Sequence, residues 1–323
     1  MKFLKNKNLL ITGGTGSFGN AAVKFLLKNT KINKLIIFSR DENKQYEMKN
    51  TYNNKKLRFF LGDVRDESRL DIALKNVDYV IHAAALKQVP AAEYNPFECI
   101  KTNIYGTQAL ILSAIKNGVK KIIGLSTDKA CNPVNLYGAT KLCAEKLLIN
   151  ANQYSDMSKT NFSVVRYGNV IASRGSVVPY FKYLILQGKK KLPLTHTEMT
   201  RFFISLNDAV IFVLEGLKRQ FGGEIFIPKM PSIYIRDLIR IINKNIGVSI
   251  TGIRYGEKIH EVLCSSDESV NLFENKGYYT IYPAYFKKKK GKKVSKDFIY
   301  SSNSKKFLNL AGVEKIIIDN NIL

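Results

Sequence analysis

The sequence has few of the residues from which metal sites and disulfide frameworks are built. Its 323 residues include four cysteines and three histidines, and tryptophan is absent. The cysteines show no C-x-x-C spacing, which argues against both a zinc site and a disulfide framework, and we interpret Cys131 as a packed thiol. The sequence has only three histidines, His82, His196 and His260, which argues against a histidine-ligated metal site and against a serine–histidine triad. We therefore expect no bound metal.

A long apolar run is also missing from the first segment, "MKFLKNKNLLITGG". Its short hydrophobic stretch leads directly into glycines, so it is too short to span a membrane. No small-residue cleavage site follows it. We interpret the segment as the first strand of a cytoplasmic protein, and we expect no insertion into a membrane.

Acidic residues are scarce relative to basic ones, with 26 Asp and Glu against 51 Lys and Arg, and the formal net charge is +25. Such a charge is compatible with a polyanionic partner, or with lysines that coat a solvated surface. The densest run, "KKKKGKK" at 287–293, has no interleaved aromatic residue and is typical of an exposed loop. We favour the solvated surface and expect no nucleic-acid partner, while a smaller basic subset serves an anionic substrate.

What the first half does contain is a regular alternation of short apolar runs with longer amphipathic ones. This pattern favours βαβ units and a parallel sheet whose strands are buried on both faces. The expected strands lie at 8–12, 35–38, 57–62, 79–85, 121–126 and 162–168. The expected helices lie at 18–29, 42–52, 67–76, 95–118 and 137–154. After about residue 170 the pattern loosens, with helices predicted at 176–187, 207–219 and 235–245 and a strand at 223–228.

A glycine motif follows the first predicted strand and opens the first predicted helix. It reads "ITGGTGSFGN" and has the spacing Gly13-x-x-Gly16-x-x-Gly19. Glycines at these places permit a tight turn, let the backbone approach a pyrophosphate and allow close packing of helix on strand. The helix N-terminus then offers its N–H groups to the phosphates. The context predicts a Rossmann doubly wound parallel sheet that binds a dinucleotide.

The end of the second strand indicates which dinucleotide is bound. Ser39, Arg40 and Lys44 favour the 2′-phosphate of NADP, although Asp41 is the type of residue that binds the ribose of NAD. We therefore expect NADP. Asp63 and Val64 after the third strand would cover the adenine, and "HAAALK" at 82–87 would line the nicotinamide side.

A third motif combines Ser126 and Thr127 at the end of the fifth strand with a Tyr137-x-x-x-Lys141 pair. Residues at i and i+4 share a helix face, so Lys141 can lie beside the Tyr137 hydroxyl. A nearby ammonium and a bound cationic nicotinamide would lower the pKa of the Tyr137 phenol, which is ordinarily near 10. Tyr137 could then accept a hydroxyl proton while hydride leaves the same carbon.

These motifs and their order identify the chain as a member of the extended short-chain dehydrogenase/reductase superfamily. Further blocks resemble the inverting UDP-N-acetylglucosamine 4,6-dehydratases, especially the enzymes that start pseudaminic acid synthesis for flagellin and other surface glycans. The blocks are "TGGTGSFG", "SRDENK", "GDVRD", "HAAALKQVPAAEYNP", "LSTDKACNPVNLYGATK", "RYGNV", "SRGSVVP", "MTRF", "GGEIFIPK" and "RYGEKIHE". The resemblance covers nearly the whole chain and weakens over about the last 50 residues.

The resemblance implies roles for five catalytic residues. Tyr137, assisted by Lys141, would be the base at the C4 hydroxyl, and Thr127 would steady that hydroxyl. Lys129 would take the C5 proton, and Asp128 would assist departure of the C6 hydroxyl. A lysine base must be neutral, so we expect the pKa of Lys129 to be depressed by partial burial or by neighbouring cations.

The expected contacts fall into two sets. Cofactor contacts are expected from Gly13, Thr15, Gly16, Ser17, Phe18, Gly19, Ser39, Arg40, Asp41, Lys44, Asp63, Val64, Ala83, Leu125, Ser126, Tyr137, Lys141 and Val170. By resemblance, the UDP-sugar would be bound by Lys87, Asn169, Val178, Arg201, Arg254 and Glu257. One departure from the family pattern is "THTEMTRF", which has His196 and Glu198 where an aspartate and an arginine are expected.

The resulting prediction is an α/β protein with two parts. Residues 1–170 form the NADP-binding Rossmann domain with the catalytic residues. Residues 171–323 form a smaller C-terminal α/β domain that binds substrate, with some segments returning to the sheet. The resemblance implies a homo-oligomer, with a hexamer as the candidate assembly. Two alternatives are a UDP-hexose 4-epimerase, which needs no acid–base pair at C5 and C6, and a non-catalytic dinucleotide-binding regulator.

Overall fold

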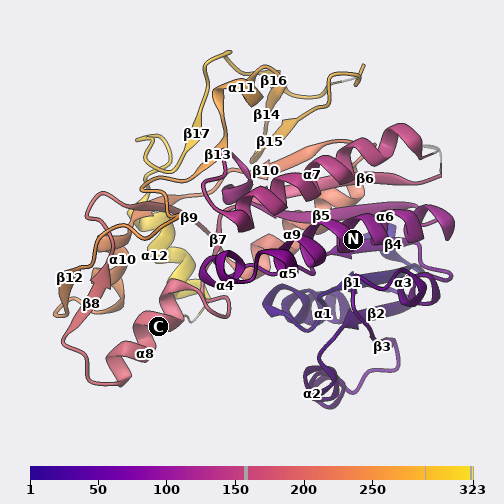
Figure 1. The fold of residues 1–323 in the computed structure, drawn as a ribbon, viewed down its shortest axis with the longest axis horizontal. Coiled ribbons are helices and arrows are strands. Elements are labelled where there is room, and N and C mark those ends of the chain that lie inside the picture. The colour runs from indigo at the N-terminus through magenta and orange to yellow at the C-terminus, as the bar shows by residue number, and fades with distance from the viewer. Residues whose placement is uncertain (156–158, 288, 321, 323) are drawn as a thin grey trace.

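A ten-stranded sheet forms the centre of the molecule in the computed structural model, which describes residues 1–155, 159–287, 289–320 and 322 (Figure 1). The strand order is β16-β14-β15-β10-β6-β5-β4-β1-β2-β3. Neighbouring strands from β3 to β10 in this order are parallel, whereas β15, β14 and β16 pair antiparallel. The order 3-2-1-4-5-6 is that of the doubly wound dinucleotide-binding sheet, so the prediction of a Rossmann fold is confirmed.

The strands of the large sheet are β1 (Asn8–Thr12), β2 (Lys34–Ser39), β3 (Leu57–Leu61), β4 (Tyr79–His82), β5 (Lys121–Thr127), β6 (Asn161–Tyr167), β10 (Ile225–Pro228), β14 (Leu272–Asn275), β15 (Tyr278–Ile281) and β16 (Lys292–Lys293). The smaller sheets contain β7 (Asn169–Val170), β8 (Lys191–Leu194), β9 (Thr200–Ile204), β11 (Ser232–Tyr234), β12 (Gly247–Ile250), β13 (Val262–Cys264) and β17 (Tyr300–Ser301).

The helices are α1 (Ser17–Asn29), α2 (Glu42–Tyr52), α3 (Glu67–Ala73), α4 (Val89–Tyr94), α5 (Pro96–Ile100), α6 (Gly106–Lys116), α7 (Leu136–Tyr154), α8 (Val177–Leu186), α9 (Leu206–Arg219), α10 (Ile235–Ile242), α11 (Ser266–Ser269) and α12 (Leu310–Asp319). Short 3₁₀ turns lie at Lys2–Leu4 and Asp128–Ala130, and a π-helical turn at Lys101–Tyr105 joins α5 to α6.

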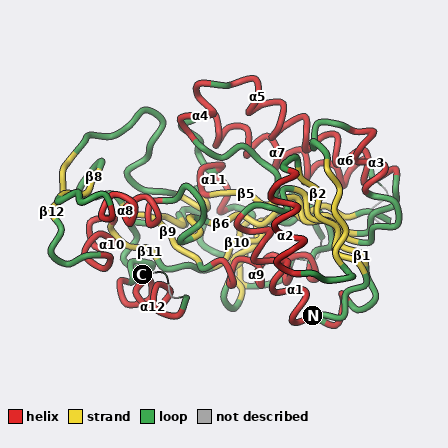
Figure 2. The backbone as a smooth tube through the Cα atoms, turned by 90° about the horizontal axis from the view of Figure 1, so that it is seen from below, coloured by secondary structure: helices red, strands yellow, loops and turns green. Residues whose placement is uncertain are grey.

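Helices cover both faces of the sheet, as adjacent residues of β5 illustrate. A Cβ built on Gly216 of α9 would lie 2.8 Å from Ile123, whereas a Cβ built on Gly124 would lie 2.2 Å from Leu148 of α7. Successive strand residues point to opposite faces, so α9 and α7 lie on opposite sides (Figure 2). Burial on both faces explains why the strands are continuous apolar runs rather than alternating ones.

The C-terminal part has a second hydrophobic core of its own. It is built mainly from α8, α10, α12 and the β7–β9–β11 sheet, at the left of Figure 2. Its buried apolar residues are Ile171, Val178, Phe181, Leu192, Leu194, Met199, Phe203, Ile233, Ile235, Leu238, Ile239, Val313 and Ile317. The chain also returns to the large sheet through β10, β14, β15 and β16. The domain boundary at residue 170 stays a prediction.

Three local predictions differ from the structure. The strand predicted at 79–85 ends at His82, and the helix predicted at 95–118 is interrupted by the π-helical turn. The run at 287–293, predicted as a loop, includes edge strand β16, which pairs with β14; residue 288 lies outside the described residues. Lysines on an edge strand discourage pairing with other chains, which suits this position. No helix within the described residues is long and apolar enough to cross a membrane.

A buried ion cluster fastens the C-terminal segment to the sheet. Arg166 of β6 is fully buried, and its guanidinium donates to Glu145 of α7 at 3.0 and 2.7 Å and to Glu268 of α11 at 2.8 Å twice. Its Nη1 also donates to the Leu263 carbonyl at 2.9 Å. Glu268 in turn forms a capping box with Ser265 at the start of α11.

We expect Arg166→Met to reduce the free energy of unfolding by about 3–5 kcal/mol, because it leaves the buried Glu145 and the partly buried Glu268 without their cation. Urea unfolding of the purified variant measures this loss. Arg240→Met is the matched control, because Arg240 is exposed and its Nη1 lies 3.5 Å from Asp237. A surface pair of this kind contributes at most about 1 kcal/mol. Equal losses of stability in the two variants would show that the Arg166 ion cluster contributes no more than a surface ion pair.

Candidate active site

A cavity of about 1510 Å³ opens where the parallel strands end, between the large sheet and the C-terminal part. It is large enough for two ligands of nucleotide size, since single small-molecule sites usually measure about 300–1,000 Å³. Its walls include the residues that follow β1, β2, β3, β4, β5 and β6 at their carboxyl ends. Ligands of doubly wound sheets bind at this edge. Members of the predicted catalytic, cofactor-binding and substrate-binding residues all line the cavity there.

The glycine loop has the geometry that close approach of a phosphate requires. Gly13 has a φ of +64°, and a Cβ there would lie 2.8 Å from the Ala84 backbone. A Cβ on Gly19 would lie 2.0 Å from the Gly14 carbonyl oxygen, so α1 can pack against the loop only with glycine at this position. Gly16 precedes α1 without a capping side chain, which leaves the first N–H groups of the helix for a ligand.

A second feature that fits a dinucleotide is Ser126. Its buried Oγ lines the cavity and has no hydrogen-bond partner among the described residues. A buried hydroxyl without a partner is unusual and indicates a polar ligand atom at that place. The loop, the helix N-terminus and Ser126 together fit a bound dinucleotide.

The end of β2 carries the residues from which cofactor type was predicted. Gln45 Nε2 donates at 3.0 Å to both the carbonyl and the Oγ of Ser39, which fixes the strand end. Asp41 accepts from the Lys44 N–H at 2.9 Å and pairs with the Lys44 ammonium, and these hydrogen bonds lower the pKa of Asp41. Arg40 is half-exposed, with Nη1 3.4 Å from Asp63. The Asp41 carboxylate is therefore engaged by a lysine at the rim of the cavity.

Thr127, Lys129, Tyr137 and Lys141 all line the cavity. Asn135 begins α7 and accepts from the Gly138 N–H at 2.8 Å, which places Tyr137 and Lys141 on the first two turns. Lys141 Nζ donates to the Leu125 carbonyl at 2.6 Å, and burial lowers its pKa to about 8.

The protein alone does not give the Tyr137 phenol the lowered pKa that is expected with a bound cationic nicotinamide. Burial raises its pKa to about 12, and the charge of Lys129 together with Thr127 only partly opposes this effect. The sequence could not reveal how deeply the hydroxyl is buried. The phenol is therefore protonated in this structure, and a further positive charge is needed to make it a base at neutral pH.

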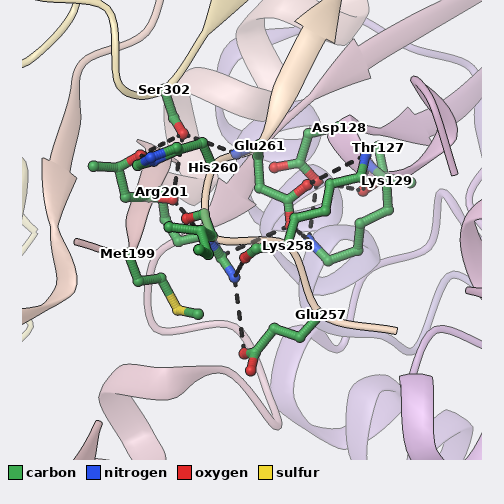
Figure 3. A network of polar contacts seen from close by, with 12 residues as sticks. Thr127, Asp128, Lys129, Met199, Arg201, Glu257, Lys258, His260, Glu261 and Ser302 are labelled. Carbon is green, nitrogen blue, oxygen red and sulfur yellow. Dashed lines mark hydrogen bonds and ion pairs between the residues drawn. The ribbon is translucent and has the colours of Figure 1, made fainter. Parts of the chain in front are cut away.

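Asp128 lies beneath the cavity wall and does not line the cavity itself. It is fully buried, and its Oδ1 accepts from Thr127 Oγ1 at 3.0 Å and from Lys129 Nζ at 3.0 Å (Figure 3). Its Oδ2 has no hydrogen-bond partner among the described residues. Burial raises the pKa of Asp128 against the opposing charge of Lys129.

The expectation of a depressed Lys129 pKa is wrong for this structure. Burial lowers the pKa of Lys129, but the charges of Asp128 and Glu261 outweigh it, so the net pKa is raised. Lys129 Nζ lies 3.2 Å from Glu261 Oε1 as well as 3.0 Å from Asp128 Oδ1. The ammonium is therefore held between two carboxylates, one of which sequence reasoning did not assign.

The side of the cavity formed by the C-terminal part carries the predicted arginines. Arg201 is buried, and its guanidinium donates to the carbonyls of Thr200, Ile259 and Lys258 at 2.8–3.0 Å. Arg254 is exposed, with Nη2 3.4 Å from Glu257 Oε1. One fixed guanidinium and one exposed guanidinium thus face the same cavity and can bind a diphosphate.

Lys87 and Asn169 also line the cavity, and Lys87 Nζ donates to the Arg174 carbonyl at 3.1 Å. Val178 does not line it, because its side chain is buried in the second core; Val177 faces the cavity instead. Gly19 packs on Gly14, away from the cavity wall.

Other predicted positions lie outside the cavity wall. Asp63 accepts from Arg65 Nη2 at 2.7 Å, which lowers its pKa despite partial burial. Glu198 pairs with Arg236 at 2.7 Å and, like His196, is not part of the wall. The remaining predicted cofactor contacts line the cavity, namely Thr15, Ser17, Phe18, Val64, Ala83, Leu125 and Val170.

Glu261 is the functional candidate that sequence reasoning missed. It lines the cavity while only 2% exposed, and it contacts both Lys129 and Arg201. The available signal was its place in the block "RYGEKIHE", where a second acidic residue follows the predicted ligands Arg254 and Glu257.

Comparisons with known proteins indicate the family to which the chain belongs. Residues 9–283 match the family model described as polysaccharide biosynthesis protein. The UDP-N-acetylglucosamine 4,6-dehydratase (inverting) of Campylobacter jejuni subsp. jejuni is 56% identical, with 92% of this chain and 93% of that protein covered. A UDP-glucose 4-epimerase of Rickettsia prowazekii is 43% identical, with 97% and 96% covered. The X-ray structure of Pen from Bacillus thuringiensis is 37% identical, covers 100% of both chains and superimposes with a TM-score of 0.92.

Proposed function

Because the chain belongs to the polysaccharide biosynthesis family, within the extended short-chain dehydrogenase/reductase fold, we propose that it is a UDP-N-acetylglucosamine 4,6-dehydratase that inverts C5. Its product would be a UDP-linked 4-keto-6-deoxy-L-arabino sugar for pseudaminic acid or a related surface glycan. One observation carries the proposal: Lys129, which is paired with the buried Asp128, lines one cavity together with Tyr137, the glycine loop and two arginines.

The proposed cofactor is NADP, held by the glycine loop, Ser126 and the cations at the end of β2. Bound there, it would accept hydride from C4 of the sugar and later return hydride to C6. Asn169, Arg201 and Arg254 would hold the diphosphate of the substrate, and Glu257 would contact the uridine.

Tyr137 begins the chemistry by accepting the proton of the C4 hydroxyl, which Thr127 orients. The positive charges of Lys129 and of the oxidised nicotinamide would bring the phenol into a range where it can act as a base. The resulting C4 ketone acidifies the proton on C5, so the next step needs a base at C5 and an acid at C6.

The Asp128–Lys129 pair can supply both groups through one proton transfer. The proton passes from Lys129 Nζ to Asp128 Oδ1 across their 3.0 Å hydrogen bond, giving a neutral amine and a carboxylic acid. The amine accepts the C5 proton, and the carboxylic acid donates to the departing C6 hydroxyl, which leaves as water. Both residues then carry their original charges. The raised pKa of buried Asp128 favours this transfer, whereas the raised pKa of Lys129 opposes it.

The direct test is mass spectrometry of the UDP-sugar after incubation with the purified protein. We expect the sugar to lose the mass of one water molecule. A product of unchanged mass but altered configuration would contradict dehydration and would support epimerisation.

A UDP-hexose 4-epimerase is the second candidate, and one structural observation favours it. Lys129 is held as an ammonium between two carboxylates, which is unfavourable for a base at C5, whereas epimerisation requires only Tyr137 and the cofactor. The 43% identical epimerase covers nearly the whole chain. We rank it second because epimerisation assigns no task to the buried Asp128–Lys129 pair.

We expect Arg40→Ala to weaken binding of NADP⁺ by about 10- to 100-fold while changing binding of NAD⁺ much less. The reason is that a charge-assisted hydrogen bond is worth about 1.5–3 kcal/mol, and only NADP⁺ carries the 2′-phosphate. Calorimetric titration of cofactor-stripped protein measures both constants. A parallel loss for both dinucleotides would place Arg40 away from the 2′-phosphate.

A further inference from the structure

The lysine at the centre of the site has two carboxylate partners, although the proposed elimination uses only one. Asp128 exchanges a proton with Lys129 in that mechanism, while Glu261 contacts the same ammonium (Figure 3). We propose that Glu261 is a positioning residue that fixes Lys129 Nζ at the sugar and sets the pH at which its neutral amine becomes available. This inference rests on the proposed dehydration and deepens it.

The position of Glu261 is fixed by the fold. Its backbone N–H donates to Ser302 Oγ at 2.9 Å, and its carbonyl accepts from the Ser302 N–H at 2.9 Å. Ser302 Oγ is in turn 2.7 Å from Thr200 Oγ1 on β9, which brings three distant segments together. The carboxylate therefore projects from an anchored backbone into the cavity, and it is only 2% exposed.

Three cations surround the Glu261 carboxylate at different distances. Its Oε1 lies 3.2 Å from Lys129 Nζ but 3.8 Å from Arg201 Nε, and its Oε2 lies 3.9 Å from Lys258 Nζ. Its Oε2 has no hydrogen-bond partner among the described residues. The shortest of these contacts is the one to Lys129, so the carboxylate acts most strongly on that ammonium.

Two consequences follow for the reaction. A carboxylate beside the ammonium makes the Lys129 amine a stronger base toward the weakly acidic C5 proton. It also lowers the fraction of neutral amine at any given pH, so at low pH the amine becomes available mainly when Asp128 accepts its proton, and loss of the proton to solvent adds to this as the pH rises. Glu261 thus links deprotonation of Lys129 to protonation of Asp128.

The test variant is Glu261→Gln, which keeps the shape of the side chain and removes its charge. The fraction of neutral Lys129 amine is measured without turnover, by competitive acetylation with acetic anhydride and quantification of Lys129 by mass spectrometry. We expect acetylation to be at least about tenfold faster than in the wild type at the same pH, since one pKa unit changes the neutral fraction tenfold.

The pH profile of dehydration provides the second readout. Losing the anion lowers the pKa of Lys129, so the ascending limb of kcat against pH should move to lower pH by at least about one unit. Because the amine is then a weaker base, kcat at the plateau should fall. Glu261→Asp retains the charge and should restore the wild-type limb.

The matched control is Glu274→Gln, which makes the same change at a carboxylate that pairs with Lys229 Nζ at 2.6 Å away from the cavity wall. It should leave both readouts unchanged. If Glu261→Gln does not fold, the double variant Lys258→Gln/Glu261→Gln removes a charge-neutral pair and takes its place with the same expectations.

Unchanged acetylation of Lys129 and an unshifted pH limb in the folded variant would overturn the inference and leave Glu261 a structural residue. The acetylation readout requires no sugar turnover. If the wild type fails to dehydrate the substrate, the proposed function is rejected, while the effect of Glu261 on Lys129 is still decided by acetylation.

Discussion

Lys129→Met should abolish formation of the dehydrated sugar, while the bound nicotinamide is still reduced by hydride from C4 of the sugar. A general base contributes about 10²- to 10⁴-fold to rate, and the variant removes the only group assigned to the C5 proton. Rapid mixing with UDP-N-acetylglucosamine should still show the absorbance of reduced nicotinamide, because the hydroxyls of Tyr137 and Thr127 are retained. It should form more slowly than in the wild type, because the charge of Lys129 no longer lowers the pKa of the Tyr137 phenol. Product is measured by mass spectrometry in the same reaction.

The Lys129 variant needs a stability control, because it leaves Asp128 and Glu261 facing each other without an ammonium. Breaking a buried ion pair costs about 3–5 kcal/mol, so lost activity could reflect lost structure. The double variant Lys129→Met/Glu261→Gln removes one of the two carboxylates and should recover part of the stability without recovering dehydration. Release of dehydrated sugar at a near wild-type rate by either variant would show that Lys129 is not the base.

Tyr137→Phe should block the earlier step, so that neither reduced nicotinamide nor product forms. We expect a fall of about 10²- to 10⁴-fold in hydride transfer, since only the hydroxyl that accepts the C4 proton is lost. Single-turnover absorbance measures hydride transfer directly. This result differs from that of Lys129→Met and separates the two half-reactions.

The matched control for Tyr137 is Tyr154→Phe, which removes the same hydroxyl near the other end of α7. Tyr154 is 62% exposed and outside the cavity wall, so its loss should not change hydride transfer. Equal rates in Tyr137→Phe and in the wild type would show that another group accepts the proton of the C4 hydroxyl, and would contradict the proposed role of Tyr137.

The parts of the molecule that sequence predicts well are those encoded by neighbouring residues. The glycine loop, the buried parallel strands and the Tyr137–Lys141 pair each depend on short spacing, and each is present in the structure. Strands β14 and β15 were not predicted, because their sequences carry mixed polar and apolar residues without a clear period.

Electrostatics at the site depends instead on residues that are far apart in the chain. The raised pKa of Lys129 comes from its sequence neighbour Asp128 and also from Glu261, a distant residue whose backbone is anchored through Ser302 and Thr200. Spacing along the sequence contains no information about the contact with Glu261, so the expected depression of the Lys129 pKa is wrong, although Lys129, Tyr137 and Lys141 do line one cavity.

The most direct test of the central claim is an NMR time course of the purified protein with UDP-N-acetylglucosamine in deuterated buffer, without added cofactor. We expect a 4-keto-6-deoxy sugar that carries deuterium at C5 and shows the couplings of the inverted configuration. We also expect turnover with retained NADP, because hydride taken from C4 is returned to C6 of the same molecule. An unchanged sugar, or a C4 epimer without loss of water, from protein that demonstrably holds the cofactor would contradict it.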